Sequence, residues 1–338
     1  MAPKRWALSL PLDGFTLAEH AEIAREAEAL GYTDAWSLEI DGVDCFVPLA
    51  LVATATHMRV GTAIVNAFTR GPATLAISAA SLAEVAPGRF CLGVGSGSQT
   101  IVEAWNGGRF VRPASRVRET VQFLRQALTG ERVTFEGQTF TVNGFRLSRP
   151  LAEPVPIYVA GLRPGMLRVA GEVGDGAIIN WLSAEDVPRL VQVVRDAAAQ
   201  AGRDPESIEI IARLMVHIDP PSPASDQFAR RDIAAYMNVP VYQAFQEWLG
   251  RAALLQPMWE AWRQGERRGA LAAIPDQVVA ELTLRGSMAE IQAHVRRYLE
   301  AGVDTASLHL QTLEREPARQ REVIRAAIRA LAPGHAAS

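Results

Sequence analysis

Lysine, cysteine and long apolar runs are all scarce in this chain. Lys4 is the only lysine, against 33 arginines, and the net charge is −3. That balance disfavours a protein whose main surface binds nucleic acid. The two cysteines, Cys45 and Cys91, are too few and too widely spaced for a disulfide framework or a zinc motif. We therefore expect a reduced, cytoplasmic protein.

No apolar segment approaches the ~20 residues that a membrane-spanning helix needs. The short apolar stretch that follows Lys4 and Arg5 also lacks the length and the small-residue cleavage site of a secretory signal. We expect no membrane partner. Apolar residues are nevertheless abundant, at 49% of 338 residues, so the chain can bury a sizeable core.

Short apolar runs alternate with helical patterns along the whole chain. The candidate strands are 6–10, 33–38, 58–65, 89–94, 155–160, 175–180, 208–216 and 307–310. Three of the intervening helices begin at a cap with an acid three residues later, at Thr16 with Glu19, Ser183 with Asp186, and Ser287 with Glu290. Eight such units predict an α/β fold, a closed (β/α)8 TIM barrel, as a single domain over residues 1–338.

Two segments are insertions beyond the eight β/α units of the predicted barrel. Residues 98–154 are expected to hold a helix and a small hairpin near Glu136, and residues 219–284 are mostly helical and rich in tryptophan and arginine. The aromatic residues of the second segment recur at helical spacing, which is typical of a core or a subunit interface. We expect a homodimer.

Glycines at 93, 95 and 97 follow one another at the end of the fourth strand. A dinucleotide-binding fingerprint would need a further glycine at Ser98 and a helix directly after it, whereas the next clear helix begins near Pro113. The carboxyl end of a barrel strand is where active sites lie. The glycines could cradle a phosphate, form a floor for a flat ring, or only make a tight turn.

Few residues offer catalytic chemistry. No histidines are paired at metal-ligand spacing, so we expect no metal. Ser96 lies between two glycines but has no evident histidine partner. His217 and His309, near strand ends, could face the site. Glu39, at the end of the second strand, and Glu103 are candidate proton donors if burial raises their pKa, although either could be a solvated loop acid.

Four stretches together resemble one family. They are GTAIVN at 61–66, APGRFCLGVGSG at 86–97, PIYVAG at 156–161 and MLRVAGEVGDG at 166–176. In combination they resemble the bacterial luciferase-like superfamily. The most similar branch is that of the coenzyme F420 (deazaflavin)-dependent oxidoreductases, such as methylenetetrahydromethanopterin reductase.

The resemblance implies a barrel that holds coenzyme F420, or alternatively FMN, at the carboxyl ends of its strands. It implies hydride transfer between this coenzyme and a small organic substrate, at a C=N, C=C or C–OH group. It also implies a bulge with a non-prolyl cis peptide bond at Ala63–Ile64, and a phosphate-binding segment from Gly161 to Gly165. The residues implied to contact the coenzyme are Ala63, Ile64, Asn66, Gly95, Ser96, Gly97, Ala160, Gly161, Leu162 and Arg163.

The chain departs from the family pattern at three places. Glu39-Ile40 stands where sugar-phosphate dehydrogenases of the family carry Asp-His, Ser98 stands where relatives carry an acid, and Asn106 stands where they often carry histidine. The catalytic candidates are therefore Glu39, Glu103 and Asn106. Two alternatives remain, an FMN-dependent monooxygenase and a barrel that only binds a ligand.

Overall fold

Eight parallel strands form a closed barrel in the computed structural model, which describes residues 4–334. The barrel strands are β1 (Arg5–Leu10), β2 (Asp34–Ser37), β3 (Arg59–Thr62), β5 (Phe90–Gly95), β8 (Ile157–Ala160), β9 (Gly176–Asn180), β10 (Glu209–His217) and β11 (Thr305–Gln311). They are hydrogen-bonded in the order β3-β2-β1-β11-β10-β9-β8-β5, and pairing of β3 with β5 closes the ring. The predicted (β/α)8 TIM barrel is confirmed.

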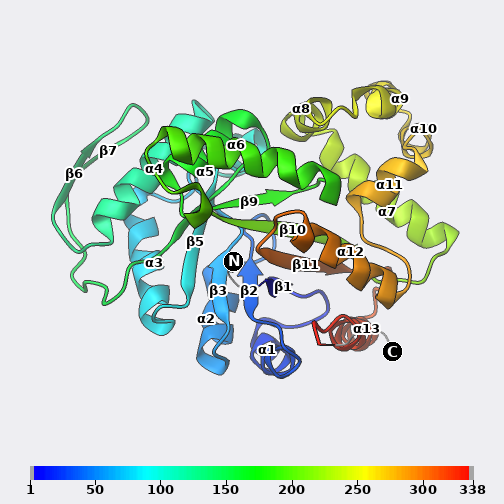
Figure 1. Ribbon diagram of the computed structural model, residues 1–338, viewed down its shortest axis with the longest axis horizontal. Coiled ribbons are helices and arrows are strands. Elements are labelled where there is room, and N and C mark those ends of the chain that lie inside the picture. Colours follow the sequence, from blue (N-terminus) through cyan, green and yellow to red (C-terminus); the bar gives the residue numbers. More distant parts are fainter. Residues whose placement is uncertain (1–3, 335–338) are drawn as a thin grey trace.

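Helices between the strands surround the barrel (Figure 1). They are α1 (His20–Ala29), α2 (Phe46–Ala55), α3 (Pro72–Val85), α4 (Pro113–Ala127), α5 (Pro164–Val173), α6 (Val187–Gln200), α12 (Met288–Glu300) and α13 (Pro317–Ala330). The three predicted caps are confirmed as capping boxes. The boxes at Thr16 and Ser183 open short 3-10 turns, η1 (Leu17–Glu19) and η3 (Ala184–Asp186), that lead into α1 and α6.

The segments beyond the barrel lie on opposite sides of it (Figure 1). One is the hairpin of β6 (Val133–Glu136) and β7 (Thr141–Phe145). The other is a group of helices, α7 (Pro223–Met237), α8 (Pro240–Trp248), α9 (Ala252–Arg263), α10 (Arg267–Ala272) and α11 (Asp276–Leu282). These helices share an apolar core with Trp181 and Met215, so they sit over the ends of β9 and β10. Trp259 is buried in that core, where its indole N–H donates to the Met237 carbonyl at 2.9 Å.

Large side chains fill the middle of the barrel. The rings of Trp36 and Tyr158 stack with centroids 5.7 Å apart and planes at 24°. Gly61 and Gly176 make room for them, because a Cβ atom would lie 2.3 Å from Trp36 at the first position and 2.9 Å from Tyr158 at the second. The barrel interior is therefore a packed core at this level.

Ion pairs close the amino-terminal end of the barrel. Arg59 donates to Asp34 at 2.7 Å and to both oxygens of Glu209 at 2.7 and 2.9 Å. Arg5 donates to the other Asp34 oxygen at 2.6 Å. Burial alone would raise the pKa of Glu209, but the hydrogen bonds and charge of Arg59 outweigh it and lower that pKa. Every member of this group has a partner of opposite charge.

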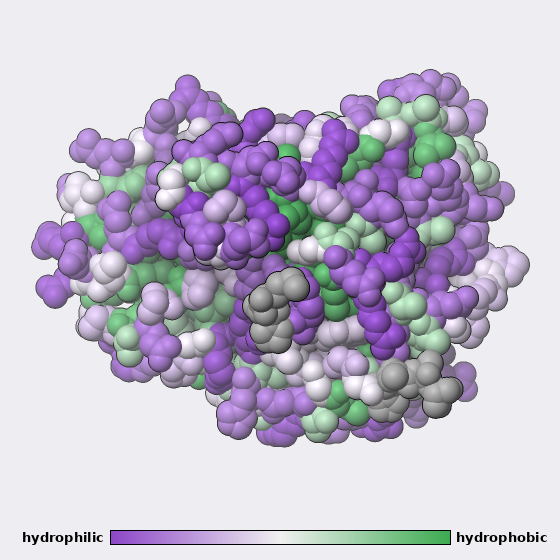
Figure 2. All heavy atoms as spheres, viewed as in Figure 1, coloured by the Kyte–Doolittle hydropathy of each residue, from purple (hydrophilic) through white to green (hydrophobic). Residues whose placement is uncertain are grey.

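The outer surface is mostly polar. Figure 2 shows hydrophilic residues over most of the visible face, with small apolar patches between them. Among residues 4–334, no helix has both the length and the apolar character needed to cross a bilayer.

Candidate active site

A bulge interrupts the third barrel strand at its carboxyl end. The ladder between β3 and β5 stops at Gly61 and Cys91, and the Thr62 hydroxyl then bonds both the N–H and the carbonyl of Gly93 at 2.8 Å. Pairing resumes at the short strand β4 (Val65–Asn66), opposite Val94 and Gly95. Between these points the Ala63–Ile64 bond is cis, as the resemblance implies.

Ile64 explains why the facing position on β5 is glycine. A Cβ atom at Gly95 would lie 2.9 Å from two carbons of the Ile64 side chain and 3.4 Å from the Ala160 side chain. Ala63, Ile64 and Ala160 also pack on the apolar cluster in the barrel. Gly95 therefore makes room for the Ile64 and Ala160 side chains. A larger residue at this position would displace Ile64.

Asn66 is a buried amide with a free donor. Its side-chain carbonyl accepts from the Phe68 N–H at 2.8 Å, while its Nδ2 has no hydrogen-bond partner in the part of the chain that the structure describes. Gly97 has a φ of +63°, and a Cβ atom there would lie 2.1 Å from Nδ2. Glycine is thus required on both grounds, and the unpaired N–H of Asn66 lies beside the bulge.

The loop after β5 differs from the prediction. No helix was expected before Pro113, but residues Thr100–Trp105 form a π-helix, η2, directly after the turn at Ser96 and Gly97. Ser98 begins it, because its carbonyl and hydroxyl accept from the N–H groups of Val102 and Ile101. The apolar periodicity that marks an α-helix is missing from this short segment, so the helix could not be predicted from the sequence.

Glu103 and Asn106 hold this loop together. The Glu103 carboxylate accepts from Gln99 at 2.7 Å and from the Phe110 N–H at 3.0 Å, and these bonds lower its pKa. The Asn106 amide donates to the Ile101 carbonyl at 2.7 Å. Both side chains are exposed. A carboxyl group with a lowered pKa is a poor proton donor near neutral pH.

Glu39 lies closer to the bulge. Its backbone N–H donates to the Ile64 carbonyl at 3.3 Å. Both of its carboxylate oxygens accept from Nε of Arg70, at 3.1 and 3.3 Å, and Arg70 also pairs with Asp44. The structure thus places Glu39 beside the bulge but with its carboxylate held by an arginine.

The turn from β8 into α5 brings together Ala160, Gly161, Leu162 and Arg163. A Cβ atom at Gly161 would lie 3.0 Å from the Leu167 N atom, so this glycine lets the strand end approach the first turn of α5 closely. Arg163 is the N-cap residue and is exposed, and its guanidinium makes no hydrogen bond or ion pair with residues 4–334. A helix N-terminus with a free arginine is a suitable environment for an anion.

A second group of polar side chains lies on β9, β10, β11 and α8, and of these sequence reasoning named only His217 and His309. Arg213 is 5% exposed, and its Nε donates to the Ser9 hydroxyl at 3.3 Å. Burial, followed by the charges of Arg213 and His217, lowers the pKa of His309 well below its ordinary value of 6.5. Burial raises the pKa of Tyr242 to about 12, against smaller opposite effects of Asn180 and Arg213. The positions of His217 and His309 near strand ends were the only sequence signal.

Several buried polar atoms near this group have no hydrogen-bond partner within the described residues. They are Trp181 Nε1, both ring nitrogens of His217, Ser307 Oγ and Gln311 Oε1. Trp181 also has a φ of +55°, in a region where a bulky residue costs about 1–2 kcal/mol. Unsatisfied polar groups and backbone strain concentrate at functional sites. The carboxyl-terminal end of the barrel is therefore the candidate active site.

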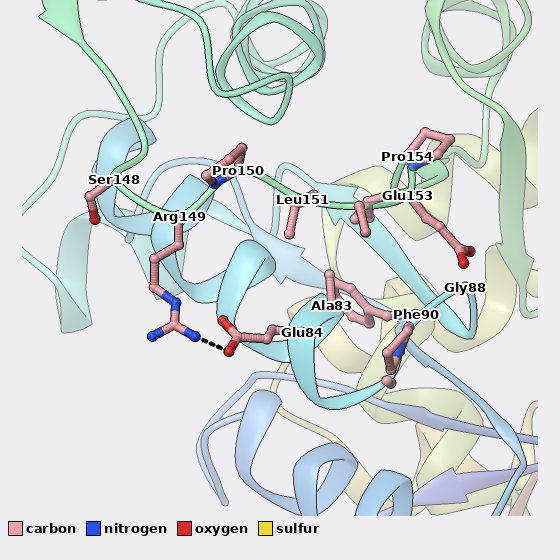
Figure 3. A pocket seen from close by; sticks show the side chains of 14 residues that line it. Ala83, Glu84, Gly88, Phe90, Ser148, Arg149, Pro150, Leu151, Glu153 and Pro154 are labelled. Carbon is pink, nitrogen blue, oxygen red and sulfur yellow. Dashed lines mark hydrogen bonds and ion pairs between the residues drawn. The ribbon is translucent and has the colours of Figure 1, made fainter.

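A surface cavity of about 430 Å3 lies elsewhere (Figure 3). It lies between the end of α3 and residues 148–155, beside Phe90 and Val155, at the amino-terminal ends of β5 and β8. Two of its charged side chains, Arg149 and Glu84, pair with each other. We do not assign the active site to this cavity, because it is at the wrong end of the barrel strands.

Within the described residues, no three histidine, cysteine, aspartate or glutamate side chains are grouped so that they could hold a metal ion. Cys45 and Cys91 are both free and buried. The groups that the carboxyl-terminal end offers to a ligand thus include the Asn66 amide, hydroxyls, imidazoles and the guanidinium groups of Arg163 and Arg213.

The chain matches known proteins over most of its length. Residues 2–305 match the family described as luciferase-like monooxygenase. The chain is 33% identical over 201 residues to a 5,10-methylenetetrahydromethanopterin reductase of Methanolobus tindarius, an alignment that covers 59% of this chain and 61% of that protein. The aligned part is thus less than two thirds of the relative.

Two solved structures show the same fold. The coenzyme F420-dependent tetrahydromethanopterin reductase of Methanopyrus kandleri superposes with a TM-score of 0.79 at 21% identity, covering 98% of both chains. The oxygenating constituent of 3,6-diketocamphane monooxygenase of Pseudomonas putida, solved in complex with FMN, gives 0.66 at 19% identity over 99% of both chains.

The family match covers all four stretches that carry the resemblance, from 61–66 to 166–176. It extends from before β1 to Thr305, the first residue of β11, and so spans the barrel from β1 through β10. The resemblance is confirmed, and the chain belongs to the luciferase-like monooxygenase family.

Proposed function

We propose that this oxidoreductase of the luciferase-like family binds coenzyme F420 at the carboxyl-terminal end of its barrel. It transfers a hydride between the coenzyme and a small organic substrate that carries a C=N, C=C or C–OH group. The proposal rests on the family match and the F420-dependent relatives, together with one observation, the unpaired amide of Asn66 beside the bulge.

The residues near the bulge fit a flat ring with carbonyl oxygens. Asn66 is 2% exposed, and its Nδ2 lacks a partner in the described part of the chain. An unpaired buried N–H costs about 1–3 kcal/mol, which a ligand acceptor would recover. The deazaflavin ring system carries such acceptors at its pyrimidinedione carbonyls. Ala63 and Ile64 would then support one face of the ring, and Gly97 keeps Asn66 in place.

The turn from β8 to α5 would hold the charged arm of the coenzyme. Gly161 brings the strand end close to α5, and Arg163 supplies a free positive charge at the helix N-terminus. Bound here, a deazaflavin supplies two-electron hydride chemistry and does not readily activate oxygen. The contribution of the protein is to bind, to orient and to exclude water.

Glu39 is proposed as a residue that positions the site. Its backbone is bonded to the bulge and its carboxylate to Arg70, so it connects the loops after β2 and β4. Glu103 and Asn106, which are exposed and bonded within their own loop, have weaker support as catalytic groups.

Titration of the purified protein with coenzyme F420 and with FMN tests the proposal. We expect quenching of F420 fluorescence with saturable binding, no flavin absorbance after purification, and oxidation of reduced F420 with members of a panel of imines, enones and ketones. A retained FMN band with oxygen consumption would instead support a monooxygenase. Binding of neither coenzyme would contradict the proposal and favour a barrel that only binds a ligand.

A homodimer in a reducing cytoplasm completes the proposal. Light scattering during gel filtration tests the dimer, and a monomer mass at micromolar concentration would contradict it. Neither expectation affects the coenzyme assignment.

A further inference from the structure

Arg213 is the most unusual charged residue inside the barrel. It lies on β10, in register with Ser307 of β11 and Asn180 of β9. On the next strand, β1, the residue in register with Ser307 is Ala7. The Arg213 side chain reaches Ser9, two residues further along β1, so it leans toward the carboxyl-terminal end of the barrel.

Two other arginines, Arg59 and Arg251, are each neutralised by two carboxylates. Arg59 pairs with Asp34 and Glu209, and Arg251 pairs with Asp186 at 2.7 Å and Glu281 at 2.6 Å. Arg213 is as buried as Arg251 but makes no ion pair with any carboxylate in residues 4–334. A guanidinium cannot lose its charge in a protein. An isolated buried charge is expensive unless something else supplies the counter-charge.

The neighbours of Arg213 do not supply it. Ser9, Asn180 and Tyr242 are neutral, and His309 is kept uncharged by burial and by the charges around it. Asp232 lies 3.5 Å from His217, and within residues 4–334 it makes no ion pair with Arg213. The protein itself thus leaves an uncompensated positive charge among hydrogen-bonding groups.

Strand order places this charge opposite the proposed coenzyme site. In the closed ring, β10 is four strands from β3 in either direction, through β11, β1 and β2 or through β9, β8 and β5. The bulge at Ala63–Ile64 follows β3. Arg213 therefore lies across the barrel from the bulge, on the side left for a substrate.

We infer that Arg213 binds a carboxylate of the substrate, with Ser9, Asn180 and Tyr242 as hydrogen-bonding neighbours. The inference names the substrate class of the proposed function and rests on it for the hydride-transfer step. The substrates are small organic acids whose reducible or oxidisable group lies between Arg213 and the bulge. A planar guanidinium suits a carboxylate because it can donate two parallel hydrogen bonds.

Matched acid and amide probes test this inference. The dissociation constants of benzoate against benzamide, and of cinnamate against cinnamamide, are measured by calorimetry with and without coenzyme F420. We expect the wild-type protein to bind each carboxylate about 10- to 100-fold more tightly than its amide. Arg213→Met should abolish this preference, Arg213→Lys should retain part of it, and Arg149→Met, at the other end of the barrel, should leave it unchanged.

The outcomes separate this inference from the coenzyme assignment. If neither carboxylate binds better than its amide, or if Arg213→Met keeps the preference, the inference is wrong even where F420 binds. If Arg213→Met weakens F420 binding but not the carboxylate preference, Arg213 serves the coenzyme and the inference is again wrong. A carboxylate preference in a protein that does not bind F420 would support the anion site and contradict only the proposed reaction.

Discussion

At the amino-terminal end of the barrel Arg59 is bound by Asp34 and Glu209. At the carboxyl-terminal end the Arg213 side chain hydrogen-bonds the Ser9 hydroxyl and makes no ion pair within residues 4–334. The two arginines point into the same barrel from strands β3 and β10. The first closes a network in which every charge is compensated. The second lies among buried atoms that lack partners within the described residues, such as those of His217 and Ser307.

The difference separates an end of the barrel where every charge is compensated from an end where buried polar groups lack partners among the described residues. Removing one member of a compensated ion-pair network lowers the stability of the protein, because the remaining charges are left buried and unpaired. Uncompensated groups lower the stability of the free protein, and a fold keeps them where a ligand completes them. The predictions below test this distinction, beginning with the largest expected effect.

Removing the arginine at each end should have opposite consequences for stability. We expect Arg59→Ala to lower the free energy of unfolding by about 3–5 kcal/mol, because Asp34 and Glu209 lose their partner. Arg213→Met should stay within about 1 kcal/mol of the wild type or exceed it, because no carboxylate is left unpaired. Urea denaturation followed by circular dichroism measures both. Equal losses in the two variants would contradict the distinction.

Two glycines with the same backbone conformation should respond differently to alanine. Gly97 and Gly107 have φ of +63° and +64°, but only Gly97 faces a side chain, since nothing lies within 4 Å of a Cβ at Gly107. We expect Gly107→Ala to cost about 1–2 kcal/mol from backbone strain alone. Gly97→Ala should lower the free energy of unfolding by a further amount of about 1–3 kcal/mol, because the new methyl group displaces Asn66.

The readouts for this pair are urea denaturation and F420 titration. Gly97→Ala should weaken coenzyme binding at least about tenfold, the equivalent of one lost hydrogen bond of the stronger kind. Gly107→Ala should leave it unchanged. Normal F420 affinity in a folded Gly97→Ala variant would show that Asn66 does not contact the coenzyme.

The two ends should also differ in their response to acid. The pKa of His309 is lowered, so the unfolded state binds a proton more readily, and stability should fall as pH drops below about 6.5. The pKa of Glu209 is also lowered, so its contribution is present above about 4.3 and is lost only as pH falls below that value. For each proton that the protein takes up on unfolding, the free energy of unfolding changes by about 1.4 kcal/mol per pH unit.

Unfolding free energies measured between about pH 2 and pH 7 in His309→Gln and Glu209→Gln separate these contributions. His309→Gln should remove the fall in unfolding free energy that begins near pH 6.5 and keep the fall that begins near pH 4.3. Glu209→Gln should keep the first fall and remove the second. A slope near pH 6.5 that survives in His309→Gln would mean that His309 is not the group held neutral.

Replacement of the two candidate acids should affect turnover unequally. A positioned proton donor is worth about 100- to 10,000-fold in rate, whereas we expect Glu39→Gln to lower turnover only about tenfold, since the amide still bonds Arg70 but loses the charge. Glu103→Gln, in the exposed loop, is the matched control and should change turnover less than about twofold. Steady-state assays with reduced F420 measure both, and a larger loss in Glu103→Gln would move the assignment to that residue.

The smallest effect is expected at the β8–α5 turn. Arg163→Ala should weaken F420 binding about threefold, because an exposed ion contact contributes little. The effect should be larger at about 0.01 M salt than at about 1 M, where charges are screened. An effect that does not depend on salt would indicate that Arg163 packs against the coenzyme and does not bind its charge.

The sequence predicted the barrel because eight short apolar runs alternate with helical patterns, a local property of the chain. Caps such as Ser287 with Glu290 were recognisable for the same reason, since a cap involves residues only three positions apart. The strand-end glycines pointed to the carboxyl-terminal end of the barrel, where the buried polar atoms without partners in the described residues also gather. The π-helix after Ser98 was missed because it has no periodic apolar face.

The role of Arg213 could not be predicted, because β10 is buried on both faces and an arginine within it gives no sign of its direction. Arg59 and Arg213 have the same side chain, and their local sequences do not show which one finds carboxylates. That depends on which strands become neighbours when the barrel closes, and on the level at which each side chain meets them. The sequence by itself determined the strands, the helix starts and the turns that need glycine. Only the closed barrel decided which buried polar groups find partners among the described residues and which do not.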